Sequence, residues 1–154
     1  MELIEQAITG SETNTDKRTP FAALVDFYHA FNSRNLERME DNWLQNDEAS
    51  MSNPLGGIKR GWNEIRQVYE KIFLGQARVY VEFYAYSIHA TEEMFVAVGR
   101  ERGSLTVNDK TIELAIRTSR TYRFDDGQWK QLHHHGSMDD AALLAKYQTT
   151  VLGK

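Results

Sequence analysis

The first half of the chain repeats apolar side chains at helical spacing. Thr19 and Pro20 precede the first of these stripes, and a hydroxyl residue followed by proline is a common helix start. The stripe therefore predicts a helix that begins at Pro20. Two further stripes of the same period predict helices over residues 36–43 and 61–73, and Gly75 is a suitable stop for the second.

From about residue 77 the apolar period changes from helical to alternating. Alternation is typical of half-buried β-strands. Short polar segments that read as turns lie at residues 91–93, 108–109 and 125–127. The last of them ends on Gly127, at a position where a hairpin turn usually needs a positive φ. The pattern predicts four long antiparallel strands, followed by a terminal helix that Asp139 caps and that carries Tyr147.

Helices come first in this order and long strands second, which is an α+β arrangement with helices packed on one face of a sheet. Strands of this length must bend or bulge, because long flat sheets are unfavourable. We expect a curved, mostly antiparallel sheet that wraps over the helices and encloses a cone with an open mouth. The expected divisions are an N-terminal extension over residues 1–18, the cone domain over 19–138 and a C-terminal helical extension over 139–154.

Composition limits the function more than it limits the fold. With 154 residues, 41% of them hydrophobic and 26% charged, the chain is long enough for one globular domain. Its net charge of −4 argues against a nucleic-acid or membrane-surface partner. The absence of cysteine removes disulfides and thiolate chemistry. The acidic N-terminus does not read as a secretory signal, so we expect a cytoplasmic protein.

Six short segments stand in an order and spacing that narrow the fold class. They cover residues 27–32, 36–43, 53–57, 61–65, 72–73 and 126–137. Together they resemble the nuclear transport factor 2-like superfamily and, within it, the SnoaL-like group. The resemblance implies the cystatin-like cone, and it implies that the histidine run at residues 133–135 is a native part of the last strand rather than a tag. The superfamily hosts isomerases, cyclases, dehydratases and assembly modules, so the fold alone does not give the function.

The resemblance to ketosteroid isomerase allows one mechanism to be checked. That enzyme places an aspartate general base just before a proline, and the matching residue here is Asn53, before Pro54. An amide does not accept a proton at neutral pH, so this base is lost. The tyrosine that binds the oxyanion aligns with Phe27 or its neighbour Tyr28, and the protonated aspartate aligns near Arg120. Steroid isomerisation by that mechanism is not expected, and whether the chain is an enzyme stays open.

Two arginines continue apolar faces of predicted strands. By period two, Arg100 and Arg120 are expected to point into the cone, towards its mouth. The chain also resembles the association domain of calcium/calmodulin-dependent kinase II, which has pocket arginines on the matching strands. Two guanidinium groups in a concave site would favour a carboxylate ligand. The alternatives are that they pair with Glu82, Glu101 or Glu113, or that they reach solvent.

The last strand offers the other polar candidates. By parity, His133 and His135 share one face with Trp129 and Gln131, while His134 faces the other way. We expect the two same-face histidines to hydrogen-bond in the pocket or at a subunit interface, and either is a candidate acid–base group. No third ligand stands at a useful spacing, so no metal is expected.

The favoured function is small-molecule binding in the cone, with an apolar or aromatic carboxylate as ligand and no cofactor. Besides the arginines and histidines, the candidate ligand-binding residues are Tyr28, Trp43, Asn53, Trp62 and Tyr84. The aromatic members of this set are equally compatible with an ordinary core. One alternative is an assembly module that forms a homodimer through the convex face of the sheet. The other is an isomerase, cyclase or dehydratase that uses a pocket histidine.

Overall fold

The structure is a computed structural model that describes residues 1–13 and 16–153. Residues 14, 15 and 154, which belong to the two expected terminal extensions, lie outside the described residues. Within the described part, the helices are α1 (Pro20–Asn32), α2 (Leu36–Asn42), α3 (Gly61–Leu74) and α4 (Ala141–Leu152). The strands are β1 (Ser50–Ser52), β2 (Lys59–Arg60), β3 (Arg78–Ala90), β4 (Met94–Val107), β5 (Lys110–Asp125) and β6 (Gln128–Ser137).

Side-chain caps fix where three of the helices begin. The Thr19 hydroxyl accepts a hydrogen bond from the Ala22 amide at the start of α1, and Asn35 caps α2 in the same way. These caps satisfy amides that the first helical turn leaves without partners. At α4 the cap is Asp140, one residue later than the Asp139 that the sequence predicts.

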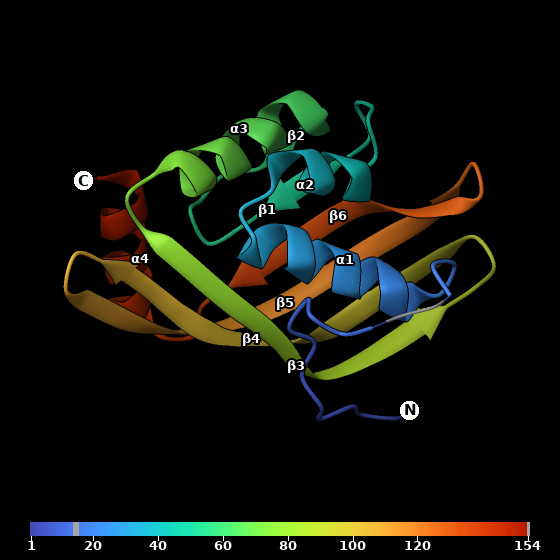
Figure 1. Cartoon of the computed structure of the whole chain (residues 1–154), viewed down its shortest axis with the longest axis horizontal. Helices are drawn as coiled ribbons and strands as arrows, with labels where there is room; N and C mark the ends of the chain where they lie inside the picture. The colour runs from blue at the N-terminus through green and yellow to red at the C-terminus, as the bar shows by residue number, and fades with distance from the viewer. Residues whose placement is uncertain (14–15, 154) are drawn as a thin grey trace.

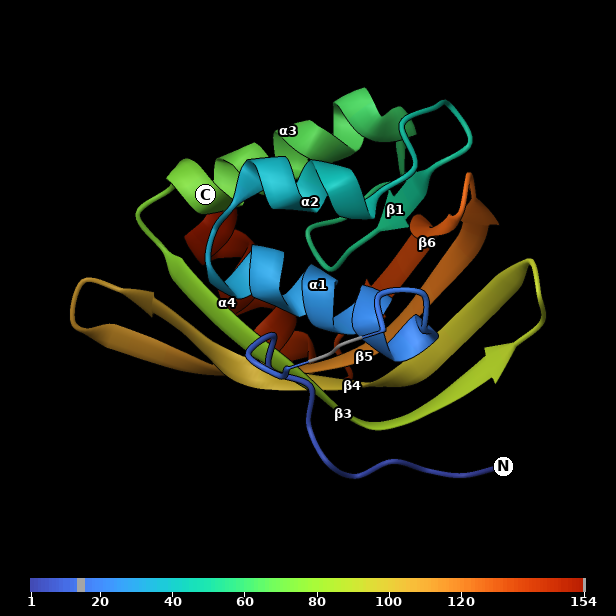
Figure 2. The same ribbon diagram turned by 45° about the vertical axis from the view of Figure 1, so that its right-hand side comes forward.

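All six strands form one sheet in the order β2-β1-β6-β5-β4-β3. The long strands pair antiparallel, and β1 joins β6 in parallel. The sheet is strongly bent, with α1, α2 and α3 on its concave side (Figures 1 and 2). This confirms the expected α+β class and the curved, mostly antiparallel sheet.

The bend of the sheet has a local cause between β3 and β4. The register shifts between Tyr84 and Ser87, and Ala85 takes a positive φ of 49° there. On the facing strand, a Cβ on Gly99 would lie 2.6 Å from the Tyr86 Cβ, so only glycine fits. A bulge opposite a glycine lets a long strand turn without breaking its ladder.

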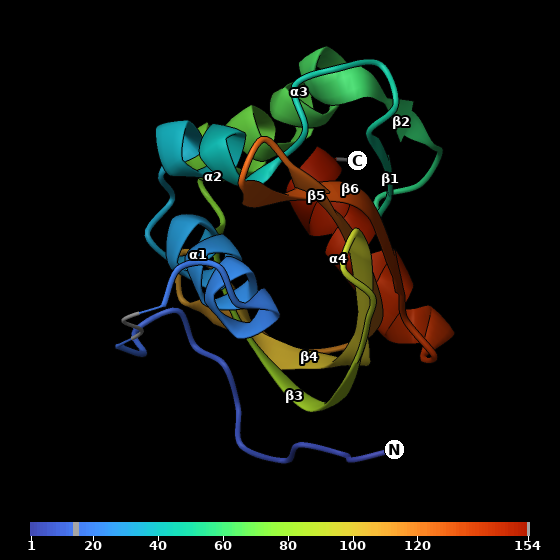
Figure 3. The same cartoon turned by 90° about the vertical axis from the view of Figure 1, so that its right-hand side faces the viewer.

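The fourth helix closes one end of the concave space. It lies near the C-terminal end of α3 (Figure 1) and shares a groove with the tip of the β4–β5 hairpin. In the view of Figure 3, α4 and α1 lie on opposite sides. Tyr147 is its single buried residue and reaches the interior. No helix in the described residues is both long and apolar enough to cross a membrane.

Candidate functional site

A buried ion pair occupies the interior of the cone. Arg120 of β5 and Glu101 of β4 are 3% and 5% exposed, and an Arg120 Nη2 to Glu101 Oε2 distance of 2.9 Å joins them. Tyr28 of α1 donates to the same Glu101 oxygen at 2.5 Å and accepts a bond from Arg120 Nε at 3.2 Å. The Arg120 guanidinium also lies 3.6 Å above the centre of the Phe27 ring. Pairing of this kind offsets the cost of burying two charges.

The ion pair continues into a chain of amide and hydroxyl groups. Arg120 Nη1 donates to Gln131 Oε1 at 2.9 Å, and Gln131 Nε2 donates to Asn42 Oδ1 at 3.2 Å. The Tyr122 hydroxyl donates to the same Asn42 oxygen at 2.8 Å, and Asn42 Nδ2 donates to the Ala23 carbonyl. One network therefore joins β4, β5 and β6 to both α1 and α2.

The network sets the charge of its members. Burial alone would lower the pKa of Arg120, but the Tyr28 and Glu101 oxygens raise it more strongly, so the guanidinium stays charged. Burial raises the pKa of Tyr28 well above its ordinary value, so its hydroxyl keeps its proton. The cluster is thus a cation and an acidic group with neutral hydrogen-bonding neighbours.

Arg120 and Glu101 border a small cavity of about 50 Å³ in the cone. Its other polar neighbours are Asn53, His134 and Tyr147. Aromatic and aliphatic side chains from the helices and the sheet form the rest of the wall: Phe27, Phe31, Met51, Pro54, Tyr69, Ile72, Val79, Val81, Leu114 and Ile116. Ligand pockets measure about 300–1,000 Å³, so the cone as it stands holds no more than a very small molecule.

His134 takes the interior place expected for its two neighbours. Between Tyr122 and Thr121 the ladder to β6 shifts register, which leaves Leu132 as an extra residue and reverses the faces that follow it. His133 and His135 therefore do not occupy the pocket, which is one of the two places expected for them, and a place at a subunit interface stays a prediction. His133 is half-buried beside the Ser50 hydroxyl, 2.8 Å from its Nδ1, and His135 is exposed.

The imidazole of His134 is neutral near pH 7. Burial lowers its pKa well below the ordinary value, and the nearby Arg120 charge lowers it further. His134 Nδ1 lies 3.3 Å from the Ser119 carbonyl, which assigns the proton to Nδ1 and leaves Nε2 as an acceptor. His134 is therefore a buried base beside the cavity.

Arg100 does not lie in the cone, contrary to the sequence prediction. Its side chain is 51% exposed on the convex face, 3.8 Å from the Asp139 carboxylate. Tyr84 lies on the same outer face, where the Arg102 guanidinium covers its ring at 4.1 Å. Both faces of β4 carry apolar residues, so period two alone does not identify the inner one. Glu101, one position along, is the residue that points inward.

The remaining candidates lie around the interior in different roles. Tyr28 belongs to the ion-pair network, and Asn53 borders the cavity while its Oδ1 accepts from the Leu55 amide. Trp43 is fully buried, with its ring 6.5 Å from that of Trp62. The Trp62 indole nitrogen donates to Glu40 Oε1 at 3.1 Å in a part-buried position. Whether any of these side chains touches a ligand stays a prediction.

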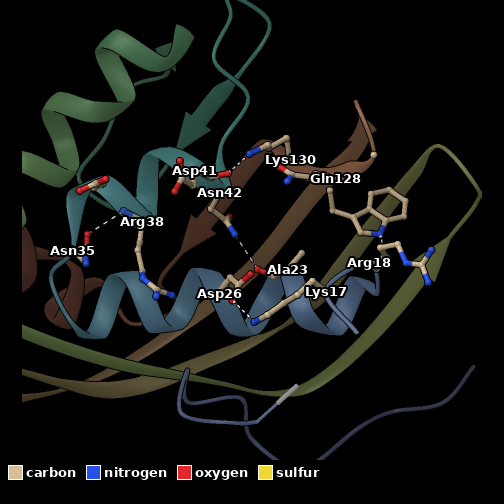
Figure 4. A pocket seen from close by; sticks show the side chains of 13 residues that line it. Lys17, Arg18, Ala23, Asp26, Asn35, Arg38, Asp41, Asn42, Gln128 and Lys130 are labelled. Carbon is tan, nitrogen blue, oxygen red and sulfur yellow. Dashed lines mark hydrogen bonds and ion pairs between the residues drawn. The ribbon is translucent and has the colours of Figure 1, made fainter. Parts of the chain in front are cut away.

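A wider groove of about 780 Å³ lies outside the cone, between α1, α2 and the β5–β6 turn (Figure 4). Its walls are mostly exposed and carry both charges, including a Lys17–Asp26 ion pair at 3.5 Å. The Trp129 indole donates to the Arg18 carbonyl. Asn42 forms part of its floor, so the buried network ends at this groove. Solvent screens the charges of the groove, whereas the cone buries an ion pair beside its cavity, so the cone is the better candidate site.

Sequence reasoning named Glu101 as one possible partner for an arginine, which the Arg120–Glu101 pair bears out, but it missed His134 and Tyr147 as interior groups. The β6 bulge leaves no sign in the residue pattern, so parity does not identify His134. Tyr147 follows Leu143 by four residues, and this spacing is the available sign of an inward helix face.

Many solved structures share this fold, among them the following three. A protein from Thiobacillus denitrificans, assigned as a calcium/calmodulin-dependent protein kinase type II association domain, is 25% identical. The match covers 82% of this chain and all of that one, with a TM-score of 0.70. A protein from Streptomyces avermitilis assigned as a dehydratase of the NTF2-like family is 17% identical over 77% of this chain and 93% of its own, with a TM-score of 0.69.

The third is a ketosteroid isomerase-like protein from Erwinia carotovora atroseptica. It is 17% identical over 78% of this chain and 93% of its own, with a TM-score of 0.65. No curated protein sequence matches the chain. The family model of the SnoaL-like domain matches residues 21–141, which is most of the chain and includes the ion pair and His134. The chain therefore belongs to the SnoaL-like domain family.

Proposed function

We propose that this protein binds a small organic molecule in the cone, and that α4 must move to admit it. The observation that supports this is the Arg120–Glu101 pair, which is fully buried and borders the cavity with His134. Apolar residues of similar size would be as stable in a pure core, so stability alone is a weak explanation for a buried ion pair. Perturbed titratable groups beside a cavity are typical of functional sites.

The ligand favoured by these groups has an apolar body and a polar end without net charge. Arg120 is balanced by Glu101, and Arg100 lies outside the cone. A carboxylate would therefore enter beside an existing acidic group, which disfavours it. A hydroxyl or carbonyl could bond to Glu101, to Arg120 or to His134 Nε2 at no charge cost.

A thermal-shift screen tests this proposal. The panel contains aromatic and aliphatic alcohols, ketones and carboxylates, each measured on the full chain. A ligand at 100 times its dissociation constant should raise the melting temperature by about 5–10 °C. If no member of the panel stabilises the protein, the proposal fails.

Two variants show whether the stabilising ligand sits in the cone. Arg120→Met combined with Glu101→Leu replaces the ion pair by apolar side chains and should abolish the shift. Arg100→Met removes an arginine from the convex face and should leave the shift unchanged. Equal shifts in both variants would place the ligand elsewhere.

Catalysis by His134 is the second candidate. A neutral buried imidazole with Nε2 as an acceptor suits proton abstraction from a ligand in the cavity. It replaces, at another position, the base that Asn53 does not supply. Hydrogen–deuterium exchange at a carbon of a bound ketone, monitored by NMR, should occur in the wild type and stop in His134→Gln. Exchange that persists in the variant excludes His134 as the base.

Self-association through the convex face is compatible with either role. Val98 is 47% exposed there and Met94 38%, next to the arginines of the same strand. The similarity to a protein assigned as an association domain supports an oligomer. Light scattering should give twice the monomer mass for the wild type and the monomer mass for Val98→Glu. A monomeric wild type at micromolar concentration would exclude it.

A further inference from the structure

Tyr147 is a phenol placed in the cone by the C-terminal helix. It is the single buried residue of α4, it is 5% exposed, and its ring forms part of the cavity wall. Every other wall residue comes from α1, α3, the sheet or the loop that follows β1. The helix therefore contributes one aromatic side chain to the cavity.

The hydroxyl of Tyr147 has no structural purpose that packing explains. No residue in the described part of the chain forms a hydrogen bond with it. Packing alone does not require the hydroxyl, because the ring of a phenylalanine would fill the same part of the cavity wall. Glu101 is near enough for its charge to act on this hydroxyl. Tyr147 therefore places a phenol in the wall of the same small cavity that Glu101, Arg120 and His134 border.

The helix that carries Tyr147 has few polar contacts with the rest of the protein, and its other core-facing side chains, Leu143, Leu144 and Val151, are only partly buried. Its hydrogen bond to the body of the protein is from Gln148 Nε2 to the Pro54 carbonyl at 2.9 Å. Open spaces of about 220 Å³ and 940 Å³ flank it, one towards α3 and one towards the β4–β5 hairpin. Segments with few buried contacts open at a small fraction of the global unfolding free energy. Release of α4 would leave a space the size of one aromatic ring, lined by aromatic and aliphatic groups.

Resting on the proposed function, we infer that Tyr147 occupies the ligand position of the cone, and that a monocyclic phenol from solution takes this place when α4 releases it. The wall chemistry fits such a molecule, because Phe27, Tyr69 and Ile116 would surround its ring. Its hydroxyl, not being attached to a helix backbone, can move on to Glu101 or to His134 Nε2. Apolar cavities of about 150 Å³ are known to bind one aromatic ring.

Calorimetric titration with p-cresol, the side-chain analogue of tyrosine, tests the inference on the full chain. The wild type must open α4 to bind, and a competent state populated at about 10% or less weakens the apparent affinity by about tenfold or more. Tyr147→Ala should therefore bind p-cresol at least about tenfold more tightly than the wild type. Toluene should bind this variant more weakly than p-cresol, because it lacks the hydroxyl.

Tyr86→Ala is the matched control. Tyr86 is also fully buried, but it stacks on Phe83 and does not border the cavity. Its removal should give no preference for p-cresol over toluene. A folded Tyr147→Ala that binds p-cresol no better than the wild type overturns the inference, and so does an equal gain in Tyr86→Ala.

A second measurement uses the wild type and does not depend on how well a variant folds. Trypsin can cut after Lys146 only when α4 leaves its place, because a helix must unfold locally to enter a protease. Saturating p-cresol should raise the rate of cleavage at Lys146 severalfold. An unchanged or lower cleavage rate with bound p-cresol would mean that p-cresol and Tyr147 occupy the cone at the same time. That result overturns the inference that one replaces the other. If p-cresol fails while another panel member stabilises the protein, the cone binds ligands but Tyr147 does not mark their position.

Discussion

At the scale of single residues, the interior of the cone depends on two charges that stabilise each other. Arg120 is shielded from solvent, and Glu101 supplies its counter-charge at 2.9 Å. Removing one partner leaves the other buried without compensation, which is much worse than removing both. Because the pair also anchors Tyr28 and Gln131, its loss would spread through the network.

The contribution of the Arg120–Glu101 ion pair to stability can be measured by unfolding experiments without a ligand. Arg120→Met should lower the free energy of unfolding by about 3–5 kcal/mol, because Glu101 is then buried alone. The double variant Arg120→Met with Glu101→Leu should recover most of that loss. Urea unfolding followed by tryptophan fluorescence measures both. A double variant no more stable than the single one would show that the loss does not come from an unpaired Glu101 charge.

His134 predicts a dependence of stability on pH. Its pKa is lowered in the folded protein, so the unfolded chain takes up its proton first as the pH falls below about 6.5. Stability is therefore full above this pH and is lost as the pH falls towards the folded pKa, by up to about 1.4 kcal/mol per pH unit and proton. The midpoint of urea unfolding between pH 7 and 5 should fall steeply for the wild type and less for His134→Gln. His133→Gln should reduce this pH dependence of the unfolding midpoint by less than His134→Gln does, since His133 is only half-buried.

At the scale of elements, the strand faces are decided by a few backbone irregularities. The bulge at Ala85 bends β3, and the extra residue Leu132 turns His134 inward. Gly99 makes room for Tyr86 at the bend. These three features give the cone its curvature and its polar lining.

Gly99→Ala should be costly because of that bend. The added methyl would lie 2.6 Å from the Tyr86 Cβ, and overpacking of this kind costs about 1–3 kcal/mol. Glu92→Ala, in the exposed turn before β4, should change stability by no more than about 0.5 kcal/mol. Thermal unfolding of the two variants side by side gives the comparison, and equal losses would contradict the close approach.

The same irregularities explain what the sequence can and cannot predict. The helices and long strands follow from apolar periodicity and from caps such as Thr19 and Asn35, which are local signals. The strands β1 and β2 have three and two residues, too few to show a period. The alternation of inward and outward side chains along β5 is uninterrupted as far as Arg120. The alternating pattern therefore predicts correctly that Arg120 lies inside the cone. Beyond a bulge, a one-residue shift exchanges the two faces, so parity misassigns the histidines of β6.

At the scale of the whole molecule, the sheet separates two surfaces of different composition. The concave side is filled by helices and the buried network, while the convex side presents arginines and exposed apolar residues of β4 to solvent. The proposed ligand site and the proposed association surface thus lie on opposite faces of the same curved strands, whose bend is visible in Figure 2. Glu101 and Arg100 are adjacent in sequence and belong to different surfaces.

Association through the convex face predicts a melting temperature that depends on protein concentration. Because only folded chains form the dimer, mass action stabilises the folded state as the protein concentration increases. The wild type should therefore melt at a higher temperature at higher concentration. Val98→Glu should melt at one temperature over the same range. A concentration-independent wild type would mean that the convex face is not paired under these conditions.

The short connection between β6 and α4 has a consequence for how binding strength could be tuned. Tyr147 follows Ser137 by ten positions, and a group on so short a linker acts at a local concentration of millimolar order. It is therefore an intramolecular competitor, and any free molecule must outcompete it. Changes in the length or capping of α4 would alter apparent affinity without changing one residue of the cone. In this architecture, α4 sets how tightly a ligand must bind to displace Tyr147, whereas the residues of the cone determine which ligand binds.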